Sequence, residues 1–113
     1  MINYEEFSKV ELKIAKVLEA VRIEGSEKLI KLTLDAGDKD EAGVLIKRQV
    51  VAGIGKFYEP DTLIGKEITI VANLEPRQLM GLESNGMILA ASDENGLALL
   101  VPDKEIRPGS GIK

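Results

Sequence analysis

A chain of 113 residues, 44% of them hydrophobic, is long enough for one core, and we expect a single domain over residues 1–113. Its 19 acidic residues outnumber 15 basic ones, and this net charge of −4 by itself argues against a nucleic-acid partner. Because cysteine and histidine are absent, disulfides, thiolate chemistry and the commonest general base and metal ligand are excluded. No apolar run approaches a membrane span and the N-terminus is unlike a signal peptide, so we expect a cytoplasmic protein without cofactor or metal.

The first element, residues 10–23, fits two kinds of secondary structure. Apolar residues alternate at Val10, Leu12 and Ile14 and then change phase, as in a long strand with a bulge. Four apolar residues also have helical spacing: Val10, Ile14, Val17 and Val21. Periodicity alone therefore leaves strand and helix open for this element.

The next two elements have the period of half-buried strands. In residues 29–35, Ile30, Leu32 and Leu34 share one face, and Lys31 lies on the other. A polar connection over residues 35–43 leads to a strand over residues 44–52. There Ile46 and Val50 point to one side and Lys47 and Gln49 to the other, which predicts that Lys31 and Lys47 lie on neighbouring strands.

The second half of the chain predicts one short helix and three more strands. Pro60 fits a first helical position and Gly65 a C-terminal cap. Strands are expected over residues 67–72, 86–91 and 97–101, separated by Asn-Gly turns. Five or six short strands with one brief helix after the third predict an all-β fold, and a small oligonucleotide-binding-fold (OB-fold) barrel fits it best.

One stretch is specific enough to indicate a family. Residues 73–91 read NLEPRQLMGLESNGMILAA, and this stretch resembles the tRNA-binding domain found at the C-termini of methionyl-tRNA synthetases and in stand-alone dimeric tRNA-binding proteins. The resemblance extends over nearly the whole chain, with further matches at residues 7–12, 26–29, 51–54 and 102–112.

That resemblance implies a fold, partners and a function. The fold would be an OB barrel with one short helix and a C-terminal extension, paired as a homodimer through residues 4–7 and the C-terminal strands. The function would be structure-directed, largely sequence-nonspecific binding of tRNA, assisting a methionyl-tRNA synthetase in cis or in trans. Because Met1 opens directly onto the domain, we expect a free-standing protein or a separately encoded synthetase subunit. An apolar run over residues 97–101 would be an edge-strand liability unless a second copy covered it.

The family's tRNA-facing surface corresponds to eight residues of this chain: Lys28, Lys31, Lys47, Lys56, Asn73, Arg77, Ser84 and Met87. Positive side chains suit phosphates, and amides, hydroxyls and soft apolar groups suit the surfaces beside them. Structural roles compete with this interpretation. Asn73 would instead cap the turn before Pro76, Ser84 would bond nearby backbone, Met87 would fill the core, and a strand lysine would simply be solvated.

Two departures from the family pattern affect how this chain would bind RNA: a missing lysine bears on the strength of binding, and a shortage of aromatic residues bears on base recognition. This chain has Glu75 and Gln78 near the turn where family members often carry a further lysine. Aromatic residues for stacking are few: Tyr4, Phe7, Phe57 and Tyr58. We therefore expect recognition of tRNA shape and backbone.

Two other classes of function compete with RNA binding. An enzyme is disfavoured, since Gly55-Lys56 lacks the other residues of a phosphate-binding loop and Ser84 has no histidine to activate it. The stronger alternative is a dimeric, chaperone-like module of the same fold family that binds peptides. The acidic net charge suits that alternative, whereas the motif at residues 73–91 favours tRNA.

Overall fold

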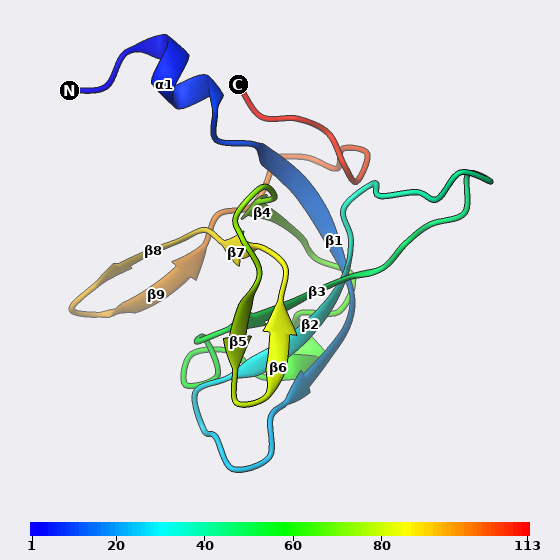
Figure 1. Cartoon of the computed structure of the whole chain (residues 1–113). Coiled ribbons are helices and arrows are strands. Elements are labelled where there is room, and N and C mark those ends of the chain that lie inside the picture. Colours follow the sequence, from blue (N-terminus) through cyan, green and yellow to red (C-terminus); the bar gives the residue numbers. More distant parts are fainter.

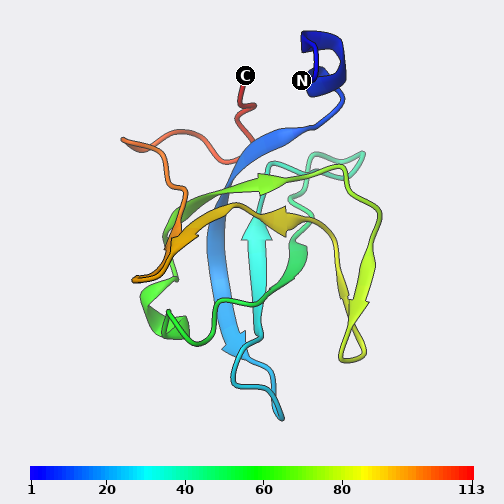
Figure 2. The ribbon, with the colours of Figure 1, turned by 90° about the vertical axis from the view of Figure 1, so that its left-hand side faces the viewer.

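A five-stranded antiparallel sheet forms the body of the molecule and curls into an incomplete barrel (Figures 1 and 2). The structure is a computed structural model that describes residues 1–113. In space the strands follow the order β3-β2-β1-β4-β7, and two hairpins, β5-β6 and β8-β9, extend from it. The nine strands are β1 Leu12–Arg22, β2 Ile30–Asp35, β3 Arg48–Ala52, β4 Glu67–Val71, β5 Arg77–Leu79, β6 Leu82–Ser84, β7 Met87–Ile88, β8 Ala90–Asp93 and β9 Gly96–Leu99. The predicted all-β barrel is confirmed.

Strand β1 is the long bent strand on which the barrel is built. Its first half, Leu12 to Lys16, pairs with β4, and its second half, Lys16 to Arg22, pairs with β2. The register shifts between Val17 and Glu19, so the strand interpretation with a bulge is confirmed and the helical alternative is wrong. A bulge bends the strand, and that bend lets one strand belong to both sides of the barrel.

The helices differ from the prediction. Residues Pro60–Thr62 form only one turn of 3₁₀-helix, η1, with the expected proline at its start. The α-helix, α1, is Tyr4–Ser8, and no residue in it is buried. Its sequence signal is a capping box: the Asn3 side chain accepts from the Glu6 N–H at 2.9 Å, and the Glu6 side chain accepts from the Asn3 N–H at 3.5 Å.

The third strand is shorter than predicted. It begins at Arg48, because Leu34 paired with Arg48 is the last register pair with β2, and residues 44–47 extend beyond that partner. They belong to the long hairpin loop after β2, where an isolated bridge joins Lys39 and Leu45. Ile46, expected on the same side of this strand as Val50, lies outside the strand and is 49% exposed, whereas Val50 is buried.

The segment after β4 holds more strands than predicted. The expected strand over residues 86–91 is divided into β7, which pairs with β4, and β8, which pairs with β9. Before it, β5 and β6 form a hairpin that sequence reasoning missed. Its tip, Met80-Gly81, has φ of 49° and 79°, the positive values that a tight two-residue turn needs.

The C-terminal extension covers the free end of β1. The main chain of Ile14 donates to the Ser110 carbonyl at 2.9 Å and accepts from the Gly109 N–H at 2.7 Å. The Ile112 N–H donates to the Leu12 carbonyl at 2.9 Å. Residues 109–112 therefore satisfy an edge of β1 that the sheet leaves open. No helix of the structure is long and apolar enough to cross a membrane.

Thirteen buried residues form one core; they come from the inner faces of the barrel strands and from the segments that follow β2, β3 and η1. Strand β2 supplies Ile30, Leu32 and Leu34, each at most 1% exposed, as its alternating pattern predicted. Lys31 and Thr33 take the other face and are half-buried.

Replacing one of these buried β2 side chains should strongly lower the free energy of unfolding. We expect Leu32→Ala to lower the free energy of unfolding by about 2–5 kcal/mol, since it removes packed apolar atoms and leaves a cavity. Urea denaturation of both proteins measures this. Val21→Ala, at a side chain that is 54% exposed, is the control and should cost less than about 1 kcal/mol. Equal losses from the two substitutions would contradict this account of the core.

Candidate nucleic-acid interface

Hydrogen bonds from residues 83–86 close the barrel where the two end strands, β3 and β7, form no ladder. Ser84, at the end of β6, is 4% exposed, and its Oγ accepts from the Val51 N–H at 2.9 Å and donates to the Gly86 carbonyl at 3.2 Å. The Asn85 N–H donates to the Gln49 carbonyl at 2.8 Å, and Gln49 Nε2 donates to the Glu83 carbonyl at 2.9 Å. These bonds hold residues 83–86 along the outer edge of β3.

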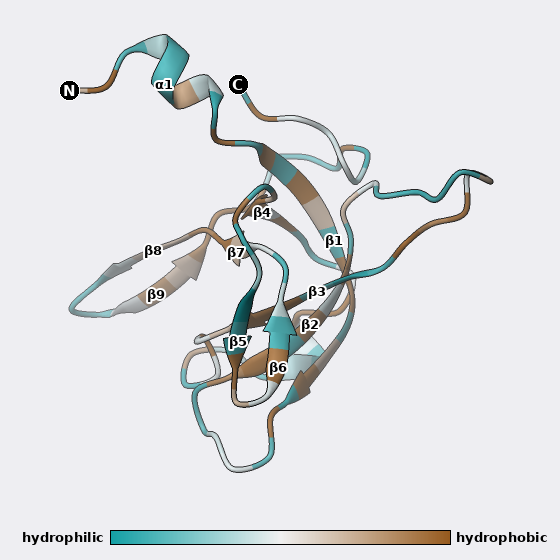
Figure 3. Cartoon of the chain, in the orientation of Figure 1, coloured by the Kyte–Doolittle hydropathy of each residue, from teal (hydrophilic) through white to brown (hydrophobic).

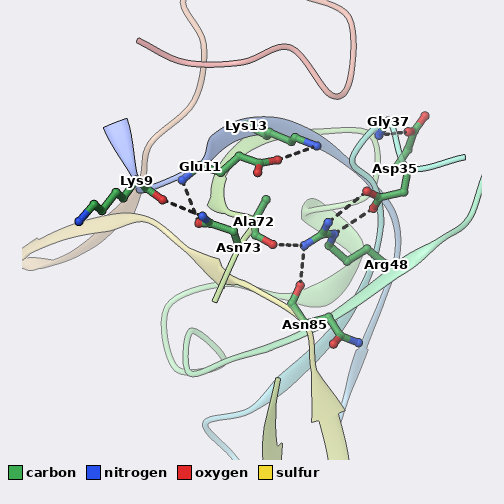
Figure 4. A network of polar contacts seen from close by, with 10 residues as sticks. Lys9, Glu11, Lys13, Asp35, Gly37, Arg48, Ala72, Asn73 and Asn85 are labelled. Carbon is green, nitrogen blue, oxygen red and sulfur yellow. Dashed lines mark hydrogen bonds and ion pairs between the residues drawn. The ribbon is translucent and has the colours of Figure 1, made fainter. Parts of the chain in front are cut away.

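Arg48 strengthens the same closure from inside. Figure 4 shows its guanidinium between Ala72 and Asn85, whose carbonyl oxygens accept at 2.7 and 3.1 Å. The guanidinium also donates to both carboxylate oxygens of Asp38, at 3.0 and 3.1 Å. One side chain on β3 therefore ties together the loop after β2, the end of β4 and the turn before β7. A bidentate pair of this kind gives geometric specificity as well as energy.

At the other end of β3, where these bonds stop, a groove of about 500 Å³ opens. It lies between β3, the β5-β6 hairpin and the segment from β7 to β9. Apolar side chains dominate its lining: Leu29, Val51, Ala52, Ile54, Leu74, Leu79, Met87, Ile88, Leu89, Ala90 and Leu97. Lys28, Glu75 and Arg77 add the charged groups. In Figure 3, hydrophobic colours on the part of β3 that lines the groove contrast with the hydrophilic colour of much of β5.

The loop between β1 and β2 is fixed beside this groove. Arg22, at the end of β1, donates to the carbonyls of Gly55 at 2.6 Å and Glu27 at 3.2 Å. The Gly55 N–H in turn donates to the Lys28 carbonyl at 2.7 Å. A Cβ on Gly53 would lie 2.8 Å from Cε of Lys28, so the lysine stem crosses that glycine. Lys28 is thereby placed at the groove beside the end of β3.

Five of the eight residues predicted to face RNA gather at or next to the groove. Lys28, Arg77, Ser84 and Met87 line it. Lys31 adjoins it, because its register partner on β3 is Val51, a lining residue. Arg77 and Met87 are exposed, whereas the Ser84 hydroxyl is fully used inside the fold, in keeping with its competing structural role.

The other three lie apart from the groove. Lys47 precedes β3 and lines a shallow cleft with Arg48 and Asn85, so the expectation of Lys31 and Lys47 on neighbouring strands is wrong. Lys56 is exposed in the turn after β3.

Asn73 holds the N-terminal segment to the barrel. Its Oδ1 accepts from the Glu11 N–H at 2.9 Å, and its Nδ2 donates to the Lys9 carbonyl at 2.7 Å (Figure 4). The competing role expected for it, a cap on the turn before Pro76, is not what the structure shows. Both ends of the amide instead bind main chain at the junction of α1 and β1.

Sequence reasoning missed the residues that shape the groove without facing it. Arg22, Arg48 and Gln49 bond to carbonyl groups up to 37 positions away along the chain. A long-range bond of this kind leaves no periodic signal.

The Asp38–Arg48 pair has a defined electrostatic consequence. Hydrogen bonds from the Arg48 guanidinium hold the pKa of Asp38 below its ordinary 3.8, although burial acts in the opposite direction; the positive charges of Arg48 and Lys13 add to the lowering. A carboxyl group whose pKa is lower in the folded state stabilises the fold above its unfolded pKa, and this contribution is lost as the pH falls.

We expect Asp38→Asn to lower the free energy of unfolding by about 1–3 kcal/mol at neutral pH, because it removes a charged partner from the half-buried Arg48. The difference from the original protein should shrink as the pH falls through 3.8, the ordinary pKa of the unfolded chain, toward the lower pKa of Asp38 in the fold. Urea denaturation over a pH series measures both effects. Asp103→Asn removes an exposed carboxylate without an ion pair and is the control. A difference that stays constant with pH would refute the assignment.

Loss of the Ser84 hydroxyl should weaken the closure of the barrel. We expect Ser84→Ala to cost about 1–3 kcal/mol, since the Val51 N–H loses its partner at a buried position. Amide hydrogen exchange at Val51 should become faster, which a general loss of packing would not single out. Ser92→Ala, at an exposed position on β8, should leave both quantities unchanged. Unaltered exchange at Val51 in the Ser84 variant would show that this bond does not hold the closure.

Comparison with known proteins identifies the family. Residues 12–111 match the family described as "Putative tRNA binding domain". The chain belongs to this tRNA-binding domain family. It is 54% identical over 111 residues to a methionine–tRNA ligase of Caldanaerobacter subterraneus subsp. tengcongensis, a match that covers 98% of this chain and 16% of the ligase. The chain thus spans about a sixth of the length of this curated relative.

Two solved structures share the fold over their whole length. A methionyl-tRNA-synthetase-related protein from Pyrococcus horikoshii superimposes with a TM-score of 0.88 at 32% identity, covering 100% of this chain and 98% of that one. The CsaA chaperone protein from Picrophilus torridus does so with a TM-score of 0.85 at 32% identity, covering 100% of both. The fold is therefore shared by a synthetase-related protein and by a chaperone protein. No group of three or more acidic side chains here is placed to hold a metal ion.

Proposed function

We propose that this domain binds tRNA through the groove and the cations around it, recognising shape and backbone more than base sequence. The observation that carries the proposal is the meeting of Lys28, Lys31 and Arg77, none of which forms an ion pair, at one apolar groove in a fold of the tRNA-binding family. Cations left free of carboxylates are available to phosphate oxygens.

The acidic net charge is compatible with this function because the binding surface is small. Charges separated by more than a Debye length, about 8 Å at physiological salt, are largely screened from each other. The three ion pairs of the structure engage Lys13, Arg22 and Arg48, all outside the groove lining. Glu75 is the one acidic residue of that lining, so the local balance there favours a polyanion.

A second element of the proposal is a symmetric homodimer that assists a methionyl-tRNA synthetase in cis or in trans. Helix α1 buries none of its residues, and Ile2, Tyr4 and Phe7 are exposed on that segment. Leu100 and Val101, after β9, are exposed as well. Apolar side chains at both chain ends would be covered by a two-fold contact, which would also present two grooves to one tRNA. Similarity to a methionine–tRNA ligase supports the choice of synthetase.

The alternative is a dimeric module that binds peptides in the same groove. It is favoured by the full-length likeness to a CsaA chaperone and by the apolar lining. The cations around the groove that form no ion pair favour RNA, since an apolar peptide carries no anionic groups to bind them.

Titration of labelled tRNA with the protein at several salt concentrations tests the proposal. We expect Lys28→Ala/Lys31→Ala/Arg77→Ala to weaken binding, because each side chain would neutralise a phosphate. The slope of log affinity against log salt should become shallower by roughly 0.7–0.9 for each phosphate that is no longer neutralised. An unstructured RNA of similar length, bound less tightly than tRNA by the original protein, reports recognition of shape.

Lys39→Ala/Lys104→Ala/Lys113→Ala is the matched control, since it removes the same charge from three exposed lysines outside the groove lining. The proposal predicts that this variant keeps most of its affinity and its salt slope. Equal weakening in the two triple variants would refute the groove as the binding surface. No preference for tRNA even at low salt, together with binding of apolar peptides, would replace the proposal with the chaperone-like function.

A further inference from the structure

The part of β3 that lines the groove has main-chain groups without partners. The Ile23 N–H donates to the Leu29 carbonyl, which shows that odd-numbered residues entering β2 point their main-chain groups at β1. The main-chain N–H and carbonyl of Lys31 therefore point at β1. Those of its register partner, Val51, point away from β2, toward the groove. The Val51 N–H is used by Ser84, whereas no hydrogen bond from a loop or side chain reaches the Val51 carbonyl oxygen.

Gly53 continues this edge. It lies just past the end of β3, lines the groove, and its N–H makes no hydrogen bond. In an extended strand the carbonyl of one residue and the N–H of the residue two positions later point to the same side. The groove is thus bordered by one acceptor, on Val51, followed by one donor, on Gly53.

The length of this free edge distinguishes between occupants. An extended peptide that adds to a sheet edge needs a run of main-chain groups, and the groups before the Val51 carbonyl are already bound to Asn85 and Ser84. One acceptor and one donor match the hydrogen-bonding edge of a single nucleobase, which presents a donor beside an acceptor. Lys28 and Arg77 lie at the same groove, in reach of a polyanion but without a counterpart on an apolar peptide.

We propose that the groove holds one unstacked nucleobase of the bound RNA, and that the Val51 carbonyl and the Gly53 N–H read the edge of that base. This inference rests on the proposed RNA-binding function and adds base contact to it. The apolar lining packs against the faces of the base, and Lys28 and Arg77 hold the adjoining phosphates. Because the two main-chain groups match a donor–acceptor pair rather than one particular base, the site detects an extruded base with little choice of sequence.

A pair of short RNA backbones tests this directly: one carries a single adenine at its centre on otherwise abasic sugars, and the other is abasic throughout. Both have the same phosphates. We expect the original protein to bind the adenine-containing strand roughly tenfold more tightly, as one good bidentate contact implies. In NMR spectra of the ¹⁵N-labelled protein, the Gly53 amide signal should shift with the first strand only.

Gly53→Pro and Gly53→Ala separate the hydrogen bond from the shape of the site. Both add a Cβ next to the flexible Lys28 stem, but only proline removes the N–H, and the extended residue Ala52 tolerates a proline after it. The adenine preference should disappear in Gly53→Pro and persist in Gly53→Ala. Circular dichroism of both variants checks that the fold is kept.

Equal binding of the two strands by the original protein, or an adenine preference that survives in Gly53→Pro, would overturn the inference. A Gly53 amide that shifts with an apolar peptide and not with either RNA would overturn it in favour of a peptide groove. If tRNA still binds in a cation-dependent way while the base makes no difference, the inference alone fails. Failure of all RNA binding would remove the proposed function as well.

Discussion

The structure depends on how β3 is held at the open side of the barrel. A closed barrel would satisfy the outer edge of β3 with a neighbouring strand, but the sheet ends at β3 on one side and at β7 on the other. Ser84 and Asn85 bond to main-chain groups of Gln49 and Val51 in place of a strand, and Arg48 ties the adjacent loops together. Because these hydrogen bonds to the edge of β3 stop at Val51, the barrel remains open beyond that residue. The groove is the part of the seam that no strand or side chain fills.

This arrangement explains why polar residues of the family motif are buried or bonded within the fold. Ser84 and Asn73 both lie in the stretch that carries the family resemblance, and each uses its side chain on main-chain groups of distant segments. One closes the seam and the other fixes the N-terminal segment. They hold the groove that we propose as the binding surface. Arg77 and Met87, before and after Ser84 in the sequence, are exposed and remain free of such bonds.

Local charge and global charge have different consequences in this molecule. The acidic excess lies partly in the exposed loop after β2, which includes Asp40 and Glu41 and projects away from the β5-β6 hairpin (Figure 1). The groove instead combines apolar side chains with cations that have no carboxylate partner. A net charge summed over the chain therefore predicts solubility better than it predicts the partner of one surface.

The sequence by itself determined the elements whose signal is local. Strict alternation in β2 identified its buried face, the phase change in β1 indicated a bulge, and the motif at residues 73–91 indicated the family and, with it, eight candidate residues. Only the tertiary structure decided which of those residues share a surface. Strand β3 could not be delimited from its own pattern, because its first residue is set by the last register pair with β2, Leu34 with Arg48. Lys47 therefore lies before the strand, and the partner of Lys31 is Val51. The groove likewise arises from long-range bonds of Arg22, Arg48 and Ser84, and the fold, rather than the spacing of residues along the chain, determines which distant carbonyl and amide groups they meet.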